Sequence, residues 1–184
     1  MAQGFEVIEH IASKPDAKSS DPAVLDLLIV GAGAAGLNAA LTAKDRGLRA
    51  VVLEKSKVAN TIENCPEGKW VYAEPDSSPP KGKLWLDGAR KEDLLERWHQ
   101  IVTENHLDVR AEEGLKSLAK QPDGSFRVVS DKGEYRARRI ILATGQRGNP
   151  RKLKVPGEER ESVYHRLHAP CRFRVPGSLA APDR

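Results

Sequence analysis

A glycine motif that directly follows an apolar run constrains this chain more than any other feature. The run at residues 25–30 (LDLLIV) is nearly continuous in apolar residues, which is typical of a strand buried on both faces of a parallel sheet. It leads into GAGAAG at residues 31–36 and then into Ala34–Arg46, a segment rich in helix formers and followed by Gly47. Residues 48–53 supply a second apolar strand. The segment therefore predicts a strand–helix–strand unit with the glycines at its first turn.

Each glycine of this motif has a physical role in the binding of a pyrophosphate. Gly31 permits the tight turn, Gly33 lets the backbone approach the phosphates, and Gly36 allows the helix to pack closely on the strand. The amides of Ala34 and Ala35, at the start of the helix, then face the phosphates. The alternative is an ordinary glycine turn before a buried helix. The ordered succession of strand, glycines, helix, strand and acid favours the nucleotide site.

The acid in this succession is Glu54, which ends the second strand with seventeen residues between it and Gly36. A carboxylate at this place accepts hydrogen bonds from both hydroxyls of an adenosine ribose. It also repels a 2′-phosphate, so we expect the site to prefer FAD or NAD to NADP. Lys55, the next residue, completes the predicted adenosine end of the site.

The rest of the chain extends the α/β pattern. Apolar residues of Lys91–Glu104 fall on one helical stripe, and Leu107–Arg110 is predicted to be a third parallel strand. A small antiparallel β-meander is expected next, followed by a separate apolar strand that ends at Thr144-Gly145. Its strands are Lys116–Lys120, Phe126–Ser130 and Glu134–Ala137, and the separate strand is Arg139–Ala143. The predicted fold is an α/β three-layer, Rossmann-like fold with a parallel sheet and a meander.

Length and composition limit the domain organisation. The 184 residues are close to one ordinary domain. Residues 1–23 are polar, contain two prolines and are expected to form a flexible leader. Residues 24–157 are expected to form the nucleotide-binding domain, and residues 158–184 a linker and an irregular tail.

Several functional classes are not supported by the composition. The two cysteines, Cys65 and Cys171, form no CxxC pair, and the five histidines show no metal-ligand spacing, so no metal site is predicted. From residue 136 onward 12 lysines and arginines face 4 acidic residues, but no nucleic-acid-binding motif accompanies them. No apolar run is long enough to cross a membrane. We therefore expect a cytoplasmic protein with a small-molecule cofactor, and we assign no catalytic residue.

Two segments resemble a known family. LLIVGAGAAGLNAALTAKDRGLRAVVLEK and, downstream, ILATGQRGNPRKLKVPGEE are similar to the FAD-binding part of the thioredoxin-reductase-like superfamily of pyridine nucleotide-disulfide oxidoreductases and of flavin-dependent monooxygenases. The resemblance covers residues 24–167. It implies an FAD-binding oxidoreductase, with NAD(P)H as the hydride donor in full-length relatives.

The resemblance also implies further site residues. Ala143, Thr144 and Gly145 match the motif where the chain passes beside the FAD, and Leu115 would offer backbone groups to the adenine. Asn60 and Thr61 are expected near the flavin ring. Cys65 lies close to them in sequence, as a structural thiol or as one that reacts with the flavin.

The departures from the family pattern leave alternatives open. The chain has one glycine motif, whereas relatives carry a second one in an inserted NAD(P)H domain, and the family pattern dissolves after residue 167. We hypothesise a truncated member of the family. The alternatives are a noncatalytic FAD- or NAD-binding module and a single-domain NAD-dependent dehydrogenase. The sequence names neither the electron acceptor nor the oligomeric state, and a homodimer stays open.

Overall fold

The computed structural model describes residues 2–72, 81–146, 152 and 154–160. Its helices are α1 (Ala2–Ala12), α2 (Ala34–Asp45), α3 (Asn60–Glu63) and α4 (Lys91–Glu104). Its strands are β1 (Leu25–Val30), β2 (Ala50–Leu53), β3 (Trp70–Val71), β4 (Ala89–Arg90), β5 (Val109–Arg110), β6 (Leu115–Lys120), β7 (Phe126–Ser130) and β8 (Glu134–Leu142).

The main sheet has the strand order β5-β2-β1-β8-β7-β6. Strand β1 pairs in parallel with β2 and β8, and β2 pairs in parallel with β5. Strands β6, β7 and the first half of β8 pair antiparallel and form the meander. Strands β3 and β4 form a separate antiparallel pair. The predicted fold class is therefore confirmed.

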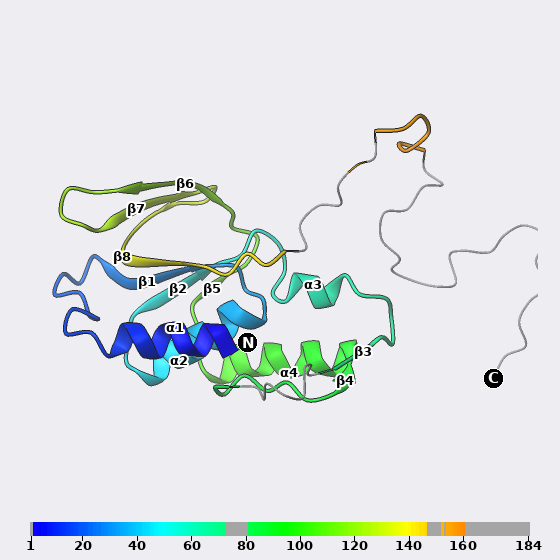
Figure 1. The fold of residues 1–184 in the computed structure, drawn as a ribbon, viewed down its shortest axis with the longest axis horizontal. Helices are drawn as coiled ribbons and strands as arrows, with labels where there is room; N and C mark the ends of the chain where they lie inside the picture. The colour runs from blue at the N-terminus through cyan, green and yellow to red at the C-terminus, as the bar shows by residue number, and fades with distance from the viewer. Residues whose placement is uncertain (1, 73–80, 147–151, 153, 161–184) are drawn as a thin grey trace, which may run out of the picture.

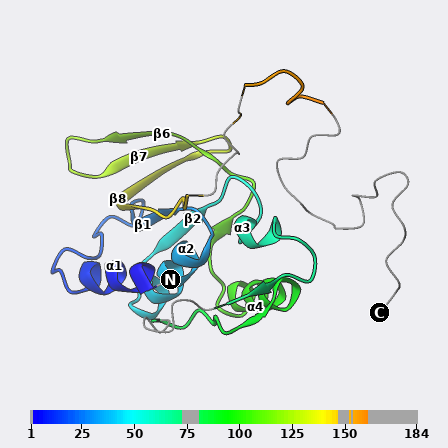
Figure 2. The same ribbon diagram turned by 45° about the vertical axis from the view of Figure 1, so that its right-hand side comes forward.

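Helices and meander lie on opposite faces of the parallel strands. In Figure 1, α1 and α2 lie side by side below β1 and β2, while β6 and β7 lie above them. The turned view in Figure 2 shows the same three layers, with α4 beside α2 on the helical side. The meander thus covers the face of the sheet that the helices leave open.

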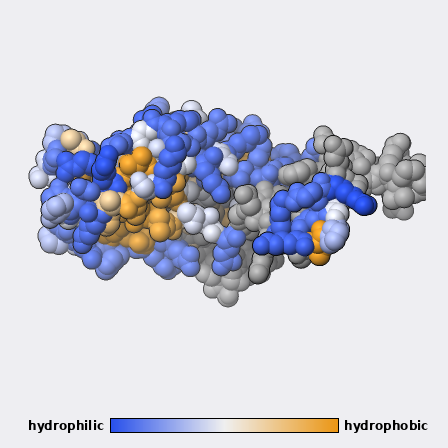
Figure 3. All heavy atoms as spheres, turned by 90° about the horizontal axis from the view of Figure 1, so that it is seen from above, coloured by the Kyte–Doolittle hydropathy of each residue, from blue (hydrophilic) through white to orange (hydrophobic). Residues whose placement is uncertain are grey.

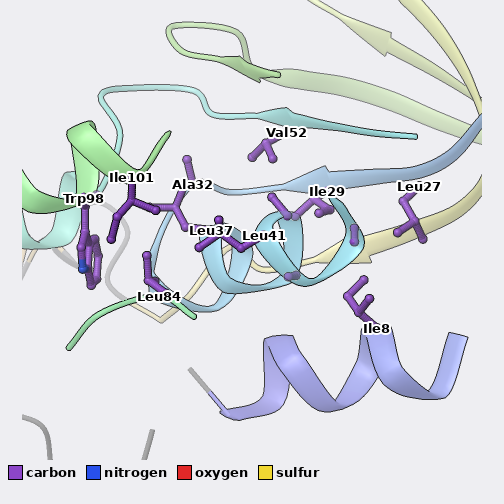
Figure 4. Close-up of a cluster of buried hydrophobic side chains, with 14 of the residues drawn as sticks. Ile8, Leu27, Ile29, Ala32, Leu37, Leu41, Val52, Leu84, Trp98 and Ile101 are labelled. Atoms are coloured by element: carbon purple, nitrogen blue, oxygen red, sulfur yellow. The ribbon is translucent and has the colours of Figure 1, made fainter. Parts of the chain in front are cut away.

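The alternation of side chains along β1 divides the core between the two faces. Leu27 and Ile29 point toward the helices and belong to one buried cluster that extends through Leu37 and Leu41 of α2 to Trp98 of α4 (Figure 4). Leu28 is fully buried on the other face, among residues of β2 and the meander. Burial of each such side chain stabilises the fold by about 1.5–3 kcal/mol. This burial on both faces is the reason why β1 reads as a continuous apolar run.

The meander side keeps some apolar surface exposed. Figure 3 looks down on this side and shows an apolar area flanked by hydrophilic residues. Among the strands of this side, Leu118 in β6 is 41% exposed and Leu142 at the end of β8 is 65% exposed. Leu142 lies at the carboxyl end of the parallel strands, where the candidate site begins.

The prediction of a flexible leader is wrong for residues 2–12, which form α1. Ile8 and Ile11 of this helix are buried, and Gly4 lies against the backbone of α2. Because the apolar stripe is short, the sequence pattern alone is weak, and packing on α2 stabilises the helix.

The prediction of two separate strands at Glu134–Ala137 and Arg139–Ala143 is also wrong. They are one strand, β8, in which Ala137 pairs both with Phe126 of β7 and with Leu25 of β1. Strand β8 therefore joins the meander to the parallel sheet. None of the helices in the described ranges combines the length and the apolar character needed to cross a bilayer.

Candidate functional site

A cavity of about 720 Å³ opens at the carboxyl ends of β1, β2 and β8. This is the edge at which open α/β sheets bind their ligands. Eleven of the residues predicted from the sequence line it: Gly31, Gly33, Ala34, Ala35, Glu54, Lys55, Asn60, Thr61, Ala143, Thr144 and Gly145. The structure thus brings together the glycine motif, the acid and the downstream Ala-Thr-Gly segment, which are far apart in the sequence.

The turn at Gly31 joins the ends of three strands. Gly31 has φ 109°, a backbone conformation that residues other than glycine rarely adopt. Its N–H donates to the carbonyl oxygen of Leu53 (2.7 Å). A Cβ at Gly31 would lie 2.5 Å from the carbonyl oxygen of Ala143. Glycine is therefore required here by the backbone conformation and by the approach of β8.

The other two glycines of the motif differ in their surroundings. A Cβ at Gly36 would collide with the carbonyl oxygen of Gly31, so this glycine lets α2 pack closely on the turn. A Cβ at Gly33 would meet no atom within 4 Å, and Gly33 lines the cavity. Gly33 also caps α2 without a side-chain hydrogen bond. The space left by its missing side chain is open to a ligand, next to the first amides of the helix.

The Glu54 carboxylate faces the glycine turn. Its Oε2 accepts the N–H of Ala32 (2.8 Å) and its Oε1 accepts the N–H of Ser56 (2.9 Å). The residue is 8% exposed and still lines the cavity. An ionised carboxylate has about four acceptor positions, so two hydrogen bonds orient Glu54 and leave acceptor capacity for a ligand.

Backbone hydrogen bonds hold the segment after Glu54 next to the start of the meander. The N–H of Glu54 donates to the carbonyl oxygen of Arg110 (2.9 Å), and the N–H of Glu113 donates to the carbonyl oxygen of Glu54 (2.8 Å). The buried Glu113 carboxylate in turn accepts the hydroxyls of Ser130 (2.5 Å) and Tyr135 (2.8 Å). This network fixes the adenosine end of the cavity on the meander.

The network gives Tyr135 an altered acidity that can be measured. Burial, together with the hydrogen bond to Glu113, raises the pKa of Tyr135 above its ordinary value of 10.0. The neutral phenol is favoured in the folded state, so its contribution to stability is present below about pH 10 and is lost as the pH rises through the raised pKa. A pH titration followed by phenolate absorbance measures this pKa. Subtracting the titration of Tyr135→Phe from that of the wild type removes the contribution of the other tyrosines. A Tyr135 midpoint at or below the ordinary value would contradict the assigned contacts.

Two predicted residues lie outside the cavity lining, and several lining residues escaped the sequence analysis. Gly36 does not line the cavity and instead lets α2 pack on the turn. Leu115 begins β6, where it pairs with Ser130, and its role at the adenine stays a prediction. Asn60 and Thr61 do line the cavity. The residues missed are Gln3, Gly4, Val7, Ala59, Ile62, Trp98, Ile141, Leu142 and Gln146. For the residues of α1, the spacing of Gly4, Ile8 and Ile11 is the signal that could have indicated a helix where the sequence analysis expected a flexible leader.

Cys65 is buried and is not among the residues that line the cavity. Its thiol donates to the carbonyl oxygen of Thr61 (3.4 Å), one turn earlier. The structure therefore gives it a packing environment, while Cys171 lies outside the described residues. No three His, Cys, Asp or Glu side chains gather as a metal-ligand group in the part of the chain that the structure describes.

Comparison with known proteins places this arrangement in a family. The model of the family described as pyridine nucleotide-disulphide oxidoreductase matches residues 28–175. The chain belongs to this family. The match begins in β1 and includes the glycine motif, Glu54 and the Ala-Thr-Gly segment, so the family assignment rests on the elements that form the cavity. The predicted family is confirmed.

Curated relatives and solved structures agree with this assignment. A ferredoxin–NADP reductase of Lactococcus lactis is 36% identical over 138 residues, which are 73% of this chain and 40% of the relative. That of Ignicoccus hospitalis is 28% identical over 148 residues, 80% of this chain and 45% of the relative. The bacillithiol disulfide reductase Bdr from Staphylococcus aureus superposes with a TM-score of 0.66 at 26% identity and covers 78% of this chain and 45% of that structure. The chain thus spans less than half the length of these relatives.

Proposed function

We propose that this chain is the FAD-binding part of an NAD(P)H-dependent oxidoreductase. The observation that carries the proposal is the Glu54 carboxylate, which accepts the N–H of Ala32 in the glycine turn, while Glu54 and the neighbouring Gly31 and Gly33 line one cavity. This places an acceptor for ribose hydroxyls beside a backbone that can approach phosphates.

The shape of the site fits a dinucleotide. The open space at Gly33 admits a diphosphate next to the amides of Ala34 and Ala35. Glu54 accepts the ribose hydroxyls, and Lys55 extends the same end of the cavity. Bound FAD supplies the redox chemistry at its flavin ring, while the residues of this chain bind and orient it. The carboxylate of Glu54 disfavours a 2′-phosphate, which supports FAD over NADP at this site.

Several properties of the whole protein are proposed from its relatives. The relatives named ferredoxin–NADP reductase and the bacillithiol disulfide reductase suggest NADPH as the hydride source and a protein or disulfide as the electron acceptor. We also propose a cytoplasmic location, because the cysteine pattern suits a reducing compartment. Addition of NADPH to the flavin-loaded chain, followed by flavin absorbance, tests whether this chain itself accepts hydride.

Glu54→Gln tests the binding site directly. Gln keeps the size of the side chain but loses the charge and places an NH₂ where the carboxylate now accepts backbone N–H groups. Loss of hydrogen bonds to a charged group costs about 1.5–3 kcal/mol, so we expect FAD affinity to fall about 10- to 100-fold. Titration of the apoprotein with FAD, followed by flavin fluorescence, measures the effect.

The matched control is Glu134→Gln. Glu134 is an exposed acid of β8 that pairs with Arg127, and it does not line the cavity. FAD affinity of this variant is expected to match that of the wild type. A wild-type chain that purifies folded and colourless and binds no added FAD would overturn the proposed function, as would an unchanged affinity in folded Glu54→Gln.

A further inference from the structure

Helix α1 forms part of the cavity, although it lies outside the residues matched by the family model. Gln3, Gly4 and Val7 line the cavity, whereas the family match begins at residue 28. Neither the family match nor the glycine motif assigns a role to these residues. Because they line the same cavity as the predicted site residues, they are candidates for contact with its ligand.

The position of α1 is fixed by contacts with α2. Gly4 lies so close to the carbonyl oxygen of Ala35 that a Cβ would collide with it, and Ile8 is fully buried between the helix and the sheet (Figure 4). On the solvent side, the Glu9 carboxylate accepts two hydrogen bonds from the guanidinium of Arg46 (2.8 and 2.6 Å). The first turn of α1 is therefore held at the start of α2, beside the glycine turn.

The segment that links α1 to β1 contacts β8, which is not the strand that Glu54 follows. The segment that follows α1 is bound to β8, since Arg139 forms an ion pair with Asp16 (2.7 Å) and donates to its carbonyl oxygen (2.9 Å). In the sheet, β1 separates β8 from β2, the strand that Glu54 follows. Because Glu54 follows β2 and Thr144 follows β8, these two lining residues lie on opposite sides of the glycine turn that follows β1, and the first turn of α1 lines the same cavity.

We propose that the first turn of α1 binds the part of FAD beyond the diphosphate, with Gln3 as its hydrogen-bonding residue and Gly4 as a positioning residue. The inference rests on the proposed function, which places the ribose at Glu54 and the diphosphate at Gly33. The rest of the molecule then extends toward Thr144 and α1. The ribityl chain carries hydroxyls, and the Gln3 amide both donates and accepts hydrogen bonds.

The test compares two ligands, because ADP carries the adenosine and diphosphate of FAD but lacks the ribityl and flavin groups. For Gln3→Ala we expect the affinity for FAD to fall about 3- to 10-fold, the effect of one hydrogen bond, while the affinity for ADP stays unchanged. Gly4→Ala displaces α1 from Ala35, whose amide belongs to the proposed diphosphate site, so this variant should weaken both ligands, and the effect on FAD alone is expected of Gln3→Ala. Calorimetric titration measures both ligands, and circular dichroism confirms that each variant is folded. The control is His10→Ala, an exposed residue of the same helix that does not line the cavity.

The outcomes separate this inference from the proposed function. A wild type that binds neither ADP nor FAD removes the proposed function and this inference with it. A wild type that binds both, with folded Gln3→Ala unchanged toward FAD, overturns the inference and leaves the proposed function standing. Equal weakening of ADP and FAD by Gln3→Ala also overturns it, because the residue would then act through the diphosphate site or the fold.

Discussion

Gly33→Val should leave the chain folded and reduce its affinity for FAD by at least about 100-fold, or about 2.8 kcal/mol. The backbone of Gly33 has φ −84° and ψ −173°, which a valine adopts without strain, and a Cβ there meets no atom within 4 Å. The folded protein therefore has room for the new side chain. A diphosphate does not, because the valine occupies the space through which phosphates approach the amides of Ala34 and Ala35.

The matched control for this prediction is Gly133→Val. Gly133 lies in the exposed turn between β7 and β8, its Cβ would also meet no atom within 4 Å, and it does not line the cavity. Both variants should unfold at nearly the same urea concentration as the wild type, while flavin fluorescence shows loss of binding only in Gly33→Val. Retention of FAD by folded Gly33→Val would exclude the glycine turn as the phosphate site.

The sequence was sufficient to predict those parts of the fold whose signals are local. Strand β1 at Leu25–Val30 and helix α4 at Lys91–Glu104 have the predicted bounds, because the first is apolar on both faces and the second has a long apolar stripe. The site residues of the glycine motif and Glu54 were predictable for another reason. Their roles depend on backbone conformation and on spacing within one strand–helix–strand unit.

The parts that escaped prediction depend on contacts between distant segments. Helix α1 is stabilised by packing on α2. Glycine is needed at Gly4 because a Cβ there would collide with the carbonyl oxygen of Ala35. Likewise, β8 is one strand because Ala137 pairs with β7 on one side and β1 on the other. The sequence of α1 or of β8 alone does not indicate which distant segments these elements contact. The cavity residues contributed by α1, α3 and α4 are therefore visible only in the folded chain.

Asp26 connects β1, which was predicted from the sequence, to the segment after α1, which was not. Of the substitutions considered, loss of its side chain should have the largest effect on stability. The side chain is buried at the start of β1, where its two oxygens accept the N–H groups of Ser19 (2.5 Å) and Arg49 (2.7 Å). The Arg49 guanidinium lies 3.7 Å from the carboxylate and also donates to the carbonyls of Pro22 (2.7 Å) and Val24 (2.7 Å). This cluster attaches the segment between α1 and β1 to the amino ends of β1 and β2.

Asp26→Ala should lower the free energy of unfolding by about 3 kcal/mol, since each buried donor left without a partner costs about 1–3 kcal/mol. The ion pair adds little to this figure, because the Arg49 side chain is 40% exposed and solvent screens it. Urea unfolding measures the loss as a lower midpoint with an unchanged slope. The control is Asp21→Ala, which removes a single exposed hydrogen bond to the Ala23 N–H and should shift the midpoint much less. Equal midpoints for the two variants would show that the Asp26 cluster does not hold this segment. A large shift confined to Asp26→Ala would show that the Asp26 cluster holds the segment that links α1 to β1. Residues of α1 line the cavity, so the same cluster would then also help to keep that part of the cavity in place.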